Sequence, residues 1–67
     1  MTTAPEFATQ ASSKDPEVGL QAVAALRRLL ERLEAMQVRN AREQGWSWEQ
    51  IAERLGVTRQ AVHKKHA

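Results

Sequence analysis

The side chains best suited to chemistry with another molecule lie near the C-terminal end of this chain. Residues 54–67 contain basic side chains and no acid, whereas glutamates offset the arginines upstream. Arg59, Gln60, His63 and Lys64 follow one another at helical spacing. At about 100° per residue, they share an arc of about 140° on one helix face. Arg donates bidentately to guanine, Gln does so to adenine, and His and Lys reach bases or phosphates. The pattern predicts a face that reads duplex DNA.

A short helix before this face is predicted to support it. Ser47 and Gln50 have the spacing of a capping box, and Trp46 is placed to pack against Ile51. The apolar positions of this helix follow the stripe of a helix buried on one side: Trp48, Ile51, Ala52 and Leu55. Both tryptophans are therefore expected in the core rather than as base-stacking platforms. Ser47 is predicted to cap the helix, and its position also makes it a candidate DNA contact.

A tight turn joins this helix to the last one. Gly56 supplies the positive φ that a β-carbon would penalise, and Val57 is expected to fill the junction. Thr58 is predicted to cap the final helix, where its hydroxyl and the first free N–H groups are placed to hold a phosphate. Ala52 is small where the two helices would cross, and Val62 returns an apolar group to the core. These separations predict a helix-turn-helix, whose second helix enters the major groove.

The sequence upstream predicts one long helix over residues 15–44. Asp15 and Pro16 are typical of a helix N-terminus, and Gly45 suits the left-handed conformation that ends a helix. One apolar set has the alternating four-three spacing of a coiled-coil seam: Ala22, Leu26, Leu29, Leu33 and Met36. A second face, formed by Leu30, Val38 and Ala41, is expected to pack on the helix-turn-helix. We expect the seam to meet a second copy of the chain; alternatively, both faces wrap one intramolecular core.

Residues 1–14 are expected to form a disordered arm. They are rich in Thr, Ala and Ser, and Phe7 is their only large apolar side chain, so little apolar burial offsets the chain entropy. A role for the arm in touching DNA or another protein is the less favoured alternative. The segment lacks the basic start and apolar run of a signal peptide, and no segment is predicted to span a membrane.

Further cations are expected on the long helix and at the end of the chain. One outer face of the long helix carries Arg28, Arg32, Arg39 and Arg42. The simplest interpretation is a solvated face with ion pairs from Arg39 to Glu43 and from Arg28 to Glu31. Arg39 and Arg42 lie nearest the turn motif and are candidate phosphate contacts. Lys65 is a further candidate, with its stem along the core and its ammonium at the helix C-terminus.

Composition argues against several other classes of protein. The chain has 67 residues, a formal net charge of +2 and no cysteine, so no disulfide or thiolate metal site is possible. A domain of this size buries only ~60% of its unfolded surface, so oligomerisation is expected to add stability. His63 and His66 lack a third metal ligand. There is no phosphate loop, metalloprotease pattern or catalytic triad, so we expect no enzyme, cofactor, metal or small-molecule ligand.

The last part of the chain, from about Leu33, resembles known DNA-binding proteins. The resemblance rests on the runs Gly45-Trp46-Ser47-Trp48, Ile51-Ala52 and Leu55-Gly56-Val57-Thr58-Arg59-Gln60-Ala61-Val62-His63-Lys64-Lys65. These runs resemble the helix-turn-helix of short actinobacterial regulators and, more loosely, the C-terminal readers of sigma factors and recombinases. With the single long helix, the chain looks most similar to the small GATC-binding nucleoid-associated proteins of streptomycetes. The resemblance implies a homodimer at many short chromosomal sites, with Thr58, Arg59, Gln60, His63 and Lys64 as recognition contacts.

Together these features predict an all-α chain with a disordered arm at 1–14, a long dimerising helix at 15–44 and a helix-turn-helix at 45–67. The predicted partners are double-stranded DNA and a second copy of the chain, in the cytoplasm on the nucleoid. A palindromic site preference is expected from the two-fold symmetry of such a dimer. The alternatives are a local transcription regulator of the same fold and a coiled-coil protein-interaction adaptor whose basic end is merely solvated.

Overall fold

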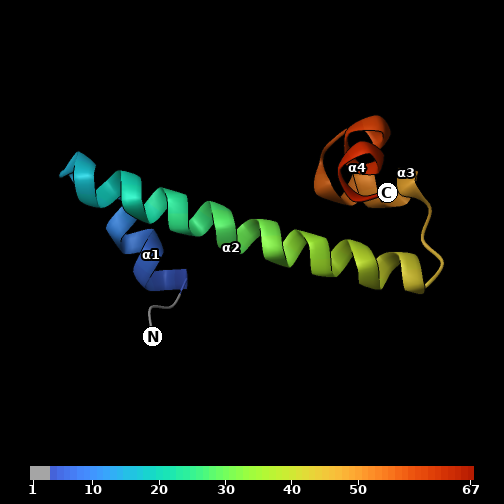
Figure 1. Ribbon diagram of the computed structural model, residues 1–67, viewed down its shortest axis with the longest axis horizontal. Coiled ribbons are helices and arrows are strands. Elements are labelled where there is room, and N and C mark those ends of the chain that lie inside the picture. The colour runs from blue at the N-terminus through green and yellow to red at the C-terminus, as the bar shows by residue number, and fades with distance from the viewer. Residues whose placement is uncertain (1–3) are drawn as a thin grey trace. The chain divides into compact units, whose positions relative to one another are not determined.

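The computed structural model describes residues 4–67, which form four α-helices joined by short turns (Figure 1). These are α1 (Ala4–Ala11), α2 (Pro16–Glu43), α3 (Trp48–Leu55) and α4 (Arg59–His66). The predicted all-α class is confirmed. Neither the 28-residue α2 nor any other described helix has an apolar stretch able to cross a membrane. The chain divides into two units, residues up to Arg32 and residues 33–67, and each is described by itself.

The first unit differs from the predicted disordered arm, because Ala4–Ala11 form helix α1. Pro5 and Glu6 lie in its first turn, where a fixed φ and a negative charge are favourable. Composition alone did not predict this helix, because it takes no account of burial in the folded chain. Phe7 and Ala11 are half-buried. The first three residues of the predicted arm lie outside the described residues.

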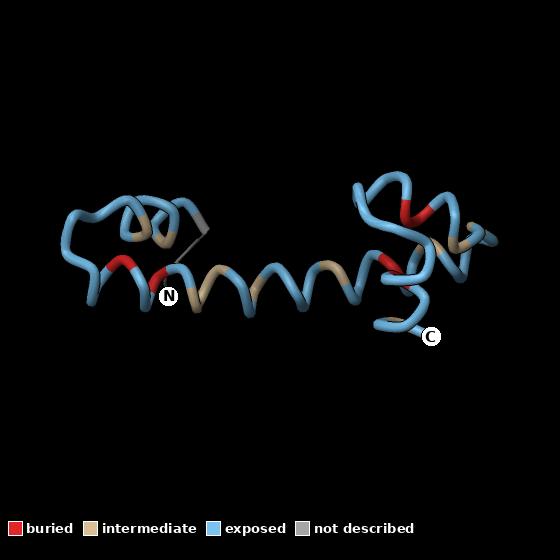
Figure 2. Tube along the Cα trace, turned by 90° about the horizontal axis from the view of Figure 1, so that it is seen from above, coloured by how far each residue is buried: buried red, intermediate tan, exposed pale blue. Residues whose placement is uncertain are grey.

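The end of α1 and the turn that follows lie close to the first turns of α2 (Figure 2). A β-carbon added at Gly19 would meet the carbonyl oxygens of Ser13 at 3.5 Å and Ala11 at 3.7 Å. Gly19 and Ala22 are both buried. The first unit therefore has a small buried contact of its own, made by side chains of little bulk.

Helix α2 begins and ends at the predicted signals. The Glu17 N–H donates to Asp15 Oδ1 over 3.0 Å, which satisfies one free donor of the first turn. At the other end, Gly45 has φ of 87°. The Trp46 N–H donates to the Ala41 carbonyl over 2.9 Å, and the Gly45 N–H to the Arg42 carbonyl over 3.1 Å. These two bonds form a Schellman motif, which ends the helix at a left-handed glycine.

The second unit has a compact apolar core built by the end of α2, by α3 and by α4. Its buried members are Val38, Ile51, Ala52 and Val62, and the half-buried residues Ala41, Trp46 and Trp48 pack against them. The expected packing of Val38 and Ala41 on the helix-turn-helix is confirmed. Leu30 was expected on the same face and is instead 67% exposed. The second unit begins after Leu30, and Glu34 occupies the next turn of that face, where it contacts α4.

Two apolar residues at the turn are more exposed than expected. Leu55 and Val57 are 39% and 47% exposed, so Leu55 is not fully on the buried stripe and Val57 does not fill the junction. The turn is closed by backbone instead: the Val57 N–H donates to the Ala52 carbonyl over 3.1 Å, past a left-handed Gly56 with φ of 70°. This second Schellman motif needs no side chain at its centre.

Candidate nucleic-acid interface

Helix α4 presents a basic outer face. Thr58 is extended, and its hydroxyl accepts a hydrogen bond from the Ala61 N–H over 3.1 Å, as predicted. Val62 is the one buried residue of this helix and holds its inner face to the core. The four candidate base contacts are all exposed: Arg59, Gln60, His63 and Lys64. The first turn of the helix contains no acid. The sequence-predicted residues therefore come together on one open face.

Helix α3 is held by the predicted capping box. The Gln50 N–H donates to Ser47 Oγ over 3.1 Å, and the Ser47 N–H donates to Gln50 Oε1 over 2.9 Å. The Ser47 hydroxyl also lies 3.2 Å from Gln50 Oε1, so it is already engaged as donor and acceptor. Ser47 is exposed at the start of α3, and its structural role in the cap is confirmed.

Trp48 connects the three helices of the second unit. Its ring lies edge-on to that of His63, with centroids 5.2 Å apart and an interplanar angle of 83°. On α2, the Arg42 guanidinium carbon is 4.6 Å from the Trp48 centroid, within the range of a cation–π interaction. The Arg42 Nη1 also donates to the Trp46 carbonyl over 2.8 Å. Trp48 is half-buried against the core, which sets where both basic side chains lie.

The arginines of α2 do not form the expected ion pairs. Within residues 4–67, there is no salt bridge between Arg39 and Glu43 and none between Arg28 and Glu31. Arg39 and Arg42 are both exposed on the second unit. Arg42 is instead fixed by the Trp46 carbonyl and the Trp48 ring. In the described part of the chain, the two arginines nearest the turn motif therefore have no acidic partner.

The end of α4 is tied to α2 by a residue that the sequence analysis did not single out. Glu34 Oε2 lies 3.0 Å from Lys65 Nζ and 2.7 Å from His66 Nε2. The hydrogen bond from Lys65, together with that from His66, holds the pKa of the Glu34 carboxyl below its usual value of 4.5. The Lys65 ammonium was expected at the C-terminus of its own helix and instead pairs with a carboxylate of α2. Glu34 lies one turn before Val38, so its place on the core face was the available signal.

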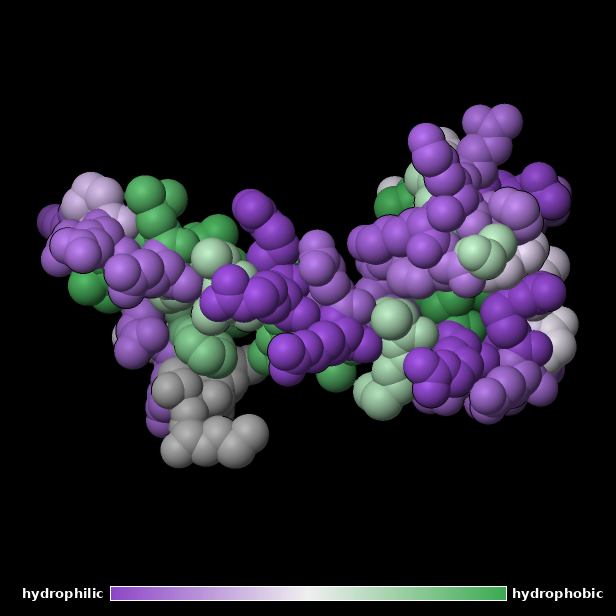
Figure 3. Space-filling view, viewed as in Figure 1, coloured by the Kyte–Doolittle hydropathy of each residue, from purple (hydrophilic) through white to green (hydrophobic). Residues whose placement is uncertain are grey.

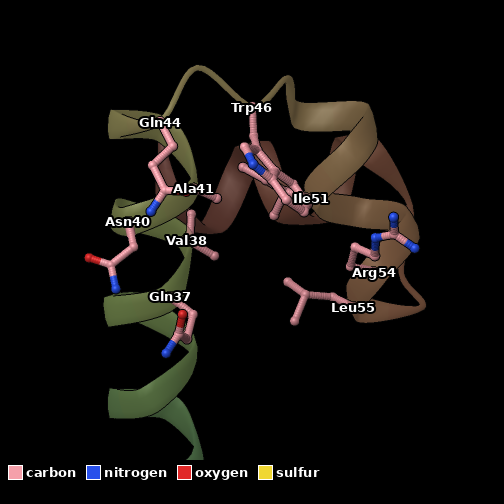
Figure 4. Close-up of a pocket in the computed structure, with 9 residues that line it drawn as sticks. All are labelled: Gln37, Val38, Asn40, Ala41, Gln44, Trp46, Ile51, Arg54 and Leu55. Carbon is pink, nitrogen blue, oxygen red and sulfur yellow. The ribbon is translucent and has the colours of Figure 1, made fainter.

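An apolar groove lies between the end of α2 and α3 (Figure 4). Its volume is about 240 Å³, and its lining consists of Gln37, Val38, Asn40, Ala41, Gln44, Trp46, Ile51, Arg54 and Leu55. The Arg54 guanidinium carbon is 6.0 Å from the Trp46 centroid, at the edge of cation–π range. The groove leaves one side of the core open, which accounts for the exposure of Leu55. Elsewhere, hydrophilic side chains cover most of the visible face of this unit (Figure 3).

The residues of the predicted seam differ in exposure within a single chain. Ala22 is 3% exposed, and Leu26 and Leu29 are half-buried. Leu33 and Met36 are 44% and 46% exposed. The seam is therefore most open at its C-terminal part.

Comparison with known proteins places this geometry in a family. Residues 24–65, which include most of α2 and all but the end of α4, match the homeodomain-like domain. No curated protein and no solved structure gave a significant match. The matched region contains the capped helix pair, the glycine turn and the basic outer face described above. The chain therefore belongs to the homeodomain-like family of helix-turn-helix DNA-binding domains.

Proposed function

We propose that this protein is a homodimeric, sequence-preferring DNA-binding protein that inserts α4 into the major groove. Arg59 and Gln60 would supply most of the base preference, and His63 and Lys64 would reach bases or phosphates. Thr58, Ser47, Arg39, Arg42 and Lys65 would contact the backbone and set the register. We propose no catalytic role for any of these residues.

The observation that carries the proposal is the acid-free outer face of α4. All four of its polar side chains are exposed, while Val62 and the Thr58 cap hold the helix against the core. A face held in this way loses little conformational freedom on binding, which favours recognition of a rigid duplex. Charge on this face and on α2 would supply much of the affinity, and that contribution would fall with salt.

The dimer is proposed from the apolar repeat of α2. Leu33 and Met36 expose large apolar side chains, and a second copy of the chain would bury them. Because Ala22 is already buried in a single chain, we place the centre of the interface near Leu33 and Met36. Two copies of α4 related by a two-fold axis would favour a palindromic site.

A role on the nucleoid, in the cytoplasm, is proposed from the small size of the reading surface. One eight-residue helix contacts few bases, so discrimination between sites would be modest and occupancy widespread. The resemblance to GATC-binding nucleoid-associated proteins of streptomycetes supports the same role. A local transcription regulator of this fold would differ by occupying few sites.

The test is selection of bound sequences from a randomised duplex pool at two salt concentrations. We expect a short palindromic motif and an affinity that falls steeply with salt, because several phosphate contacts release counterions. The frequency of that motif in the genome then separates a nucleoid protein from a regulator of few sites.

Two outcomes would contradict the proposal. Retention without any motif would mean that α4 does not read bases. Absence of retention at low salt would remove DNA as the partner and favour a protein-interaction adaptor built on α2.

A further inference from the structure

A second basic surface of the second unit lies between the three helices, on the side of Trp48. We call it the basic hollow: a concavity of about 470 Å³ lined by Arg39 and Arg42 of α2, Trp48 of α3, and Lys65 and His66 of α4. Its remaining lining residues are apolar, and no carboxylate is among them. Helices α2 and α4 thus bring one sign of charge to one place, beside the Trp48 ring of α3.

Arg42 is already oriented at this hollow. Its Nη1 donates to the Trp46 carbonyl over 2.8 Å, and its guanidinium carbon lies 4.6 Å from the Trp48 centroid. These contacts restrict the rotamers of a long side chain, so less entropy is lost when another group binds. They leave further N–H donors of the planar guanidinium, whose geometry matches the oxygens of a phosphate.

The other basic side chains of the hollow have few acidic partners. The Arg39 side chain makes no hydrogen bond or ion pair among residues 4–67. Lys65 and His66 share a single carboxylate oxygen, Glu34 Oε2, at 3.0 and 2.7 Å. Arg39, Arg42 and Lys65 therefore place three positive charges near the single carboxylate of Glu34. A second anion would lower the energy of this arrangement.

We propose that the basic hollow is a binding site for one phosphate group. Arg42 and Arg39 would donate to the phosphate oxygens, while Lys65 would contribute charge from the opposite wall. The phosphate has two possible sources, the DNA backbone and a free phosphorylated small molecule. Only the first source rests on the proposed DNA-binding function.

The first experiment uses the full chain and inorganic phosphate, without DNA. Phosphate is titrated against chloride at constant ionic strength, and the indole N–H resonances of both tryptophans are followed. Trp48 lines the hollow, whereas Trp46 lines the apolar groove and serves as an internal reference. We expect a saturable shift of the Trp48 resonance and little change at Trp46.

Substitution of Arg39 tests whether the hollow is the site. Arg39→Gln keeps a good helix former and removes no side-chain hydrogen bond or ion pair seen among residues 4–67, so the fold is expected to be retained. Loss of one charged donor should weaken phosphate binding about three- to ten-fold. Arg28→Gln is the matched control, because it removes the same charge from α2 and Arg28 does not line the hollow. The absence of a saturable Trp48 shift, or equal weakening by both substitutions, would overturn the proposal.

The second experiment distinguishes the two sources of phosphate. If the group belongs to the DNA backbone, Arg39→Gln lowers affinity equally for preferred and scrambled duplexes and reduces the salt slope by about one. If DNA affinity is unchanged while phosphate binding falls, the hollow serves a free phosphorylated molecule. A protein that binds phosphate but no DNA would contradict the proposed function and still support this site.

Discussion

Arg59 is the side chain on which base preference should depend most directly. It is exposed in the first turn of α4, beside the Thr58 cap, and its guanidinium is able to form two hydrogen bonds with guanine. Arg59→Ala should therefore cost about 1–3 kcal/mol on the preferred duplex and relax selectivity at one base position. Affinities for the preferred and scrambled duplexes, measured at one salt concentration, check this prediction.

Lys64 lies on the same face, and the effect of its substitution on DNA affinity is compared with that of Arg59→Ala. If Lys64 contacts a phosphate, Lys64→Ala should weaken binding to all sequences alike and lower the salt slope by about one. Equal losses on preferred and scrambled duplexes for Arg59→Ala would exclude base reading by Arg59.

Glu34 makes stability depend on pH through its contacts with the end of α4. The Lys65 and His66 contacts keep the pKa of Glu34 below 4.5 in the folded chain. Its stabilising contribution is therefore complete above pH 4.5 and is lost as the pH falls through the lower, folded-state pKa. Glu34→Gln should lower the free energy of unfolding by at most about 1 kcal/mol near neutral pH, since the pair is partly solvated.

Unfolding of the wild type and Glu34→Gln across a pH series measures this effect. The difference between the two proteins should shrink in acid. Glu31→Gln removes a neighbouring acid that makes no ion pair among the described residues, and should show no such trend. If the difference in the free energy of unfolding stays constant down to strongly acid pH, ionised Glu34 is not the source of the pH dependence.

At the scale of helices and turns, two glycines should respond in opposite ways to the same substitution. Gly56 has φ of 70° and open space where a β-carbon would lie, so only backbone strain opposes Ala. Gly56→Ala should destabilise the chain by about 1–2 kcal/mol. Gly19 has no positive φ, and a β-carbon added there would lie 3.5 Å from the Ser13 carbonyl oxygen, an ordinary contact distance. Gly19→Ala should stabilise the chain by about 0.5–1 kcal/mol, since Ala is the better helix former.

Denaturant unfolding of the two variants, each against the wild type, provides the measurement. Destabilisation by Gly19→Ala would mean that the contact between α2 and the carbonyls of Ser13 and Ala11 is tighter than observed. Tolerance of Gly56→Ala would mean that the turn does not need a left-handed residue.

At the scale of the whole molecule, the proposed function predicts association of two copies through α2. Leu33→Glu places a charge at the proposed interface in both copies, and should raise the dimer dissociation constant by at least about ten-fold. Leu20→Glu is the matched control, because Leu20 is 70% exposed and lies on the opposite side of α2 by helical spacing. Sedimentation of the full chain and both variants at micromolar concentration tests the assignment. A monomeric wild type would exclude the dimer, and with it the reason for a palindromic site.

Much of the second unit was predictable because its features depend on neighbours within a few residues. The limits of α2, the Ser47–Gln50 capping box, the Gly56 turn and the Thr58 cap are all confirmed. The outward face of α4 follows from the same local rules, since Val62 fixes which side of the helix is buried. Local sequence thus determined the helices, their ends and the set of residues on the candidate reading face.

Only the tertiary structure decided which distant residues meet. Glu34 contacts Lys65 and His66, and Arg42 lies over Trp48, because the core packs the end of α2 against α3 and α4. Leu30 lies before the second unit and Leu55 borders the apolar groove, so both are exposed. The Ala11 carbonyl at the end of α1 lies beside Gly19 of α2, although the composition of this segment favoured disorder. Helical periodicity assigns a residue to a face but does not say where a neighbouring helix begins or ends. Which side chains are buried, and which charges pair, depends on where those neighbouring helices lie, and therefore on tertiary packing.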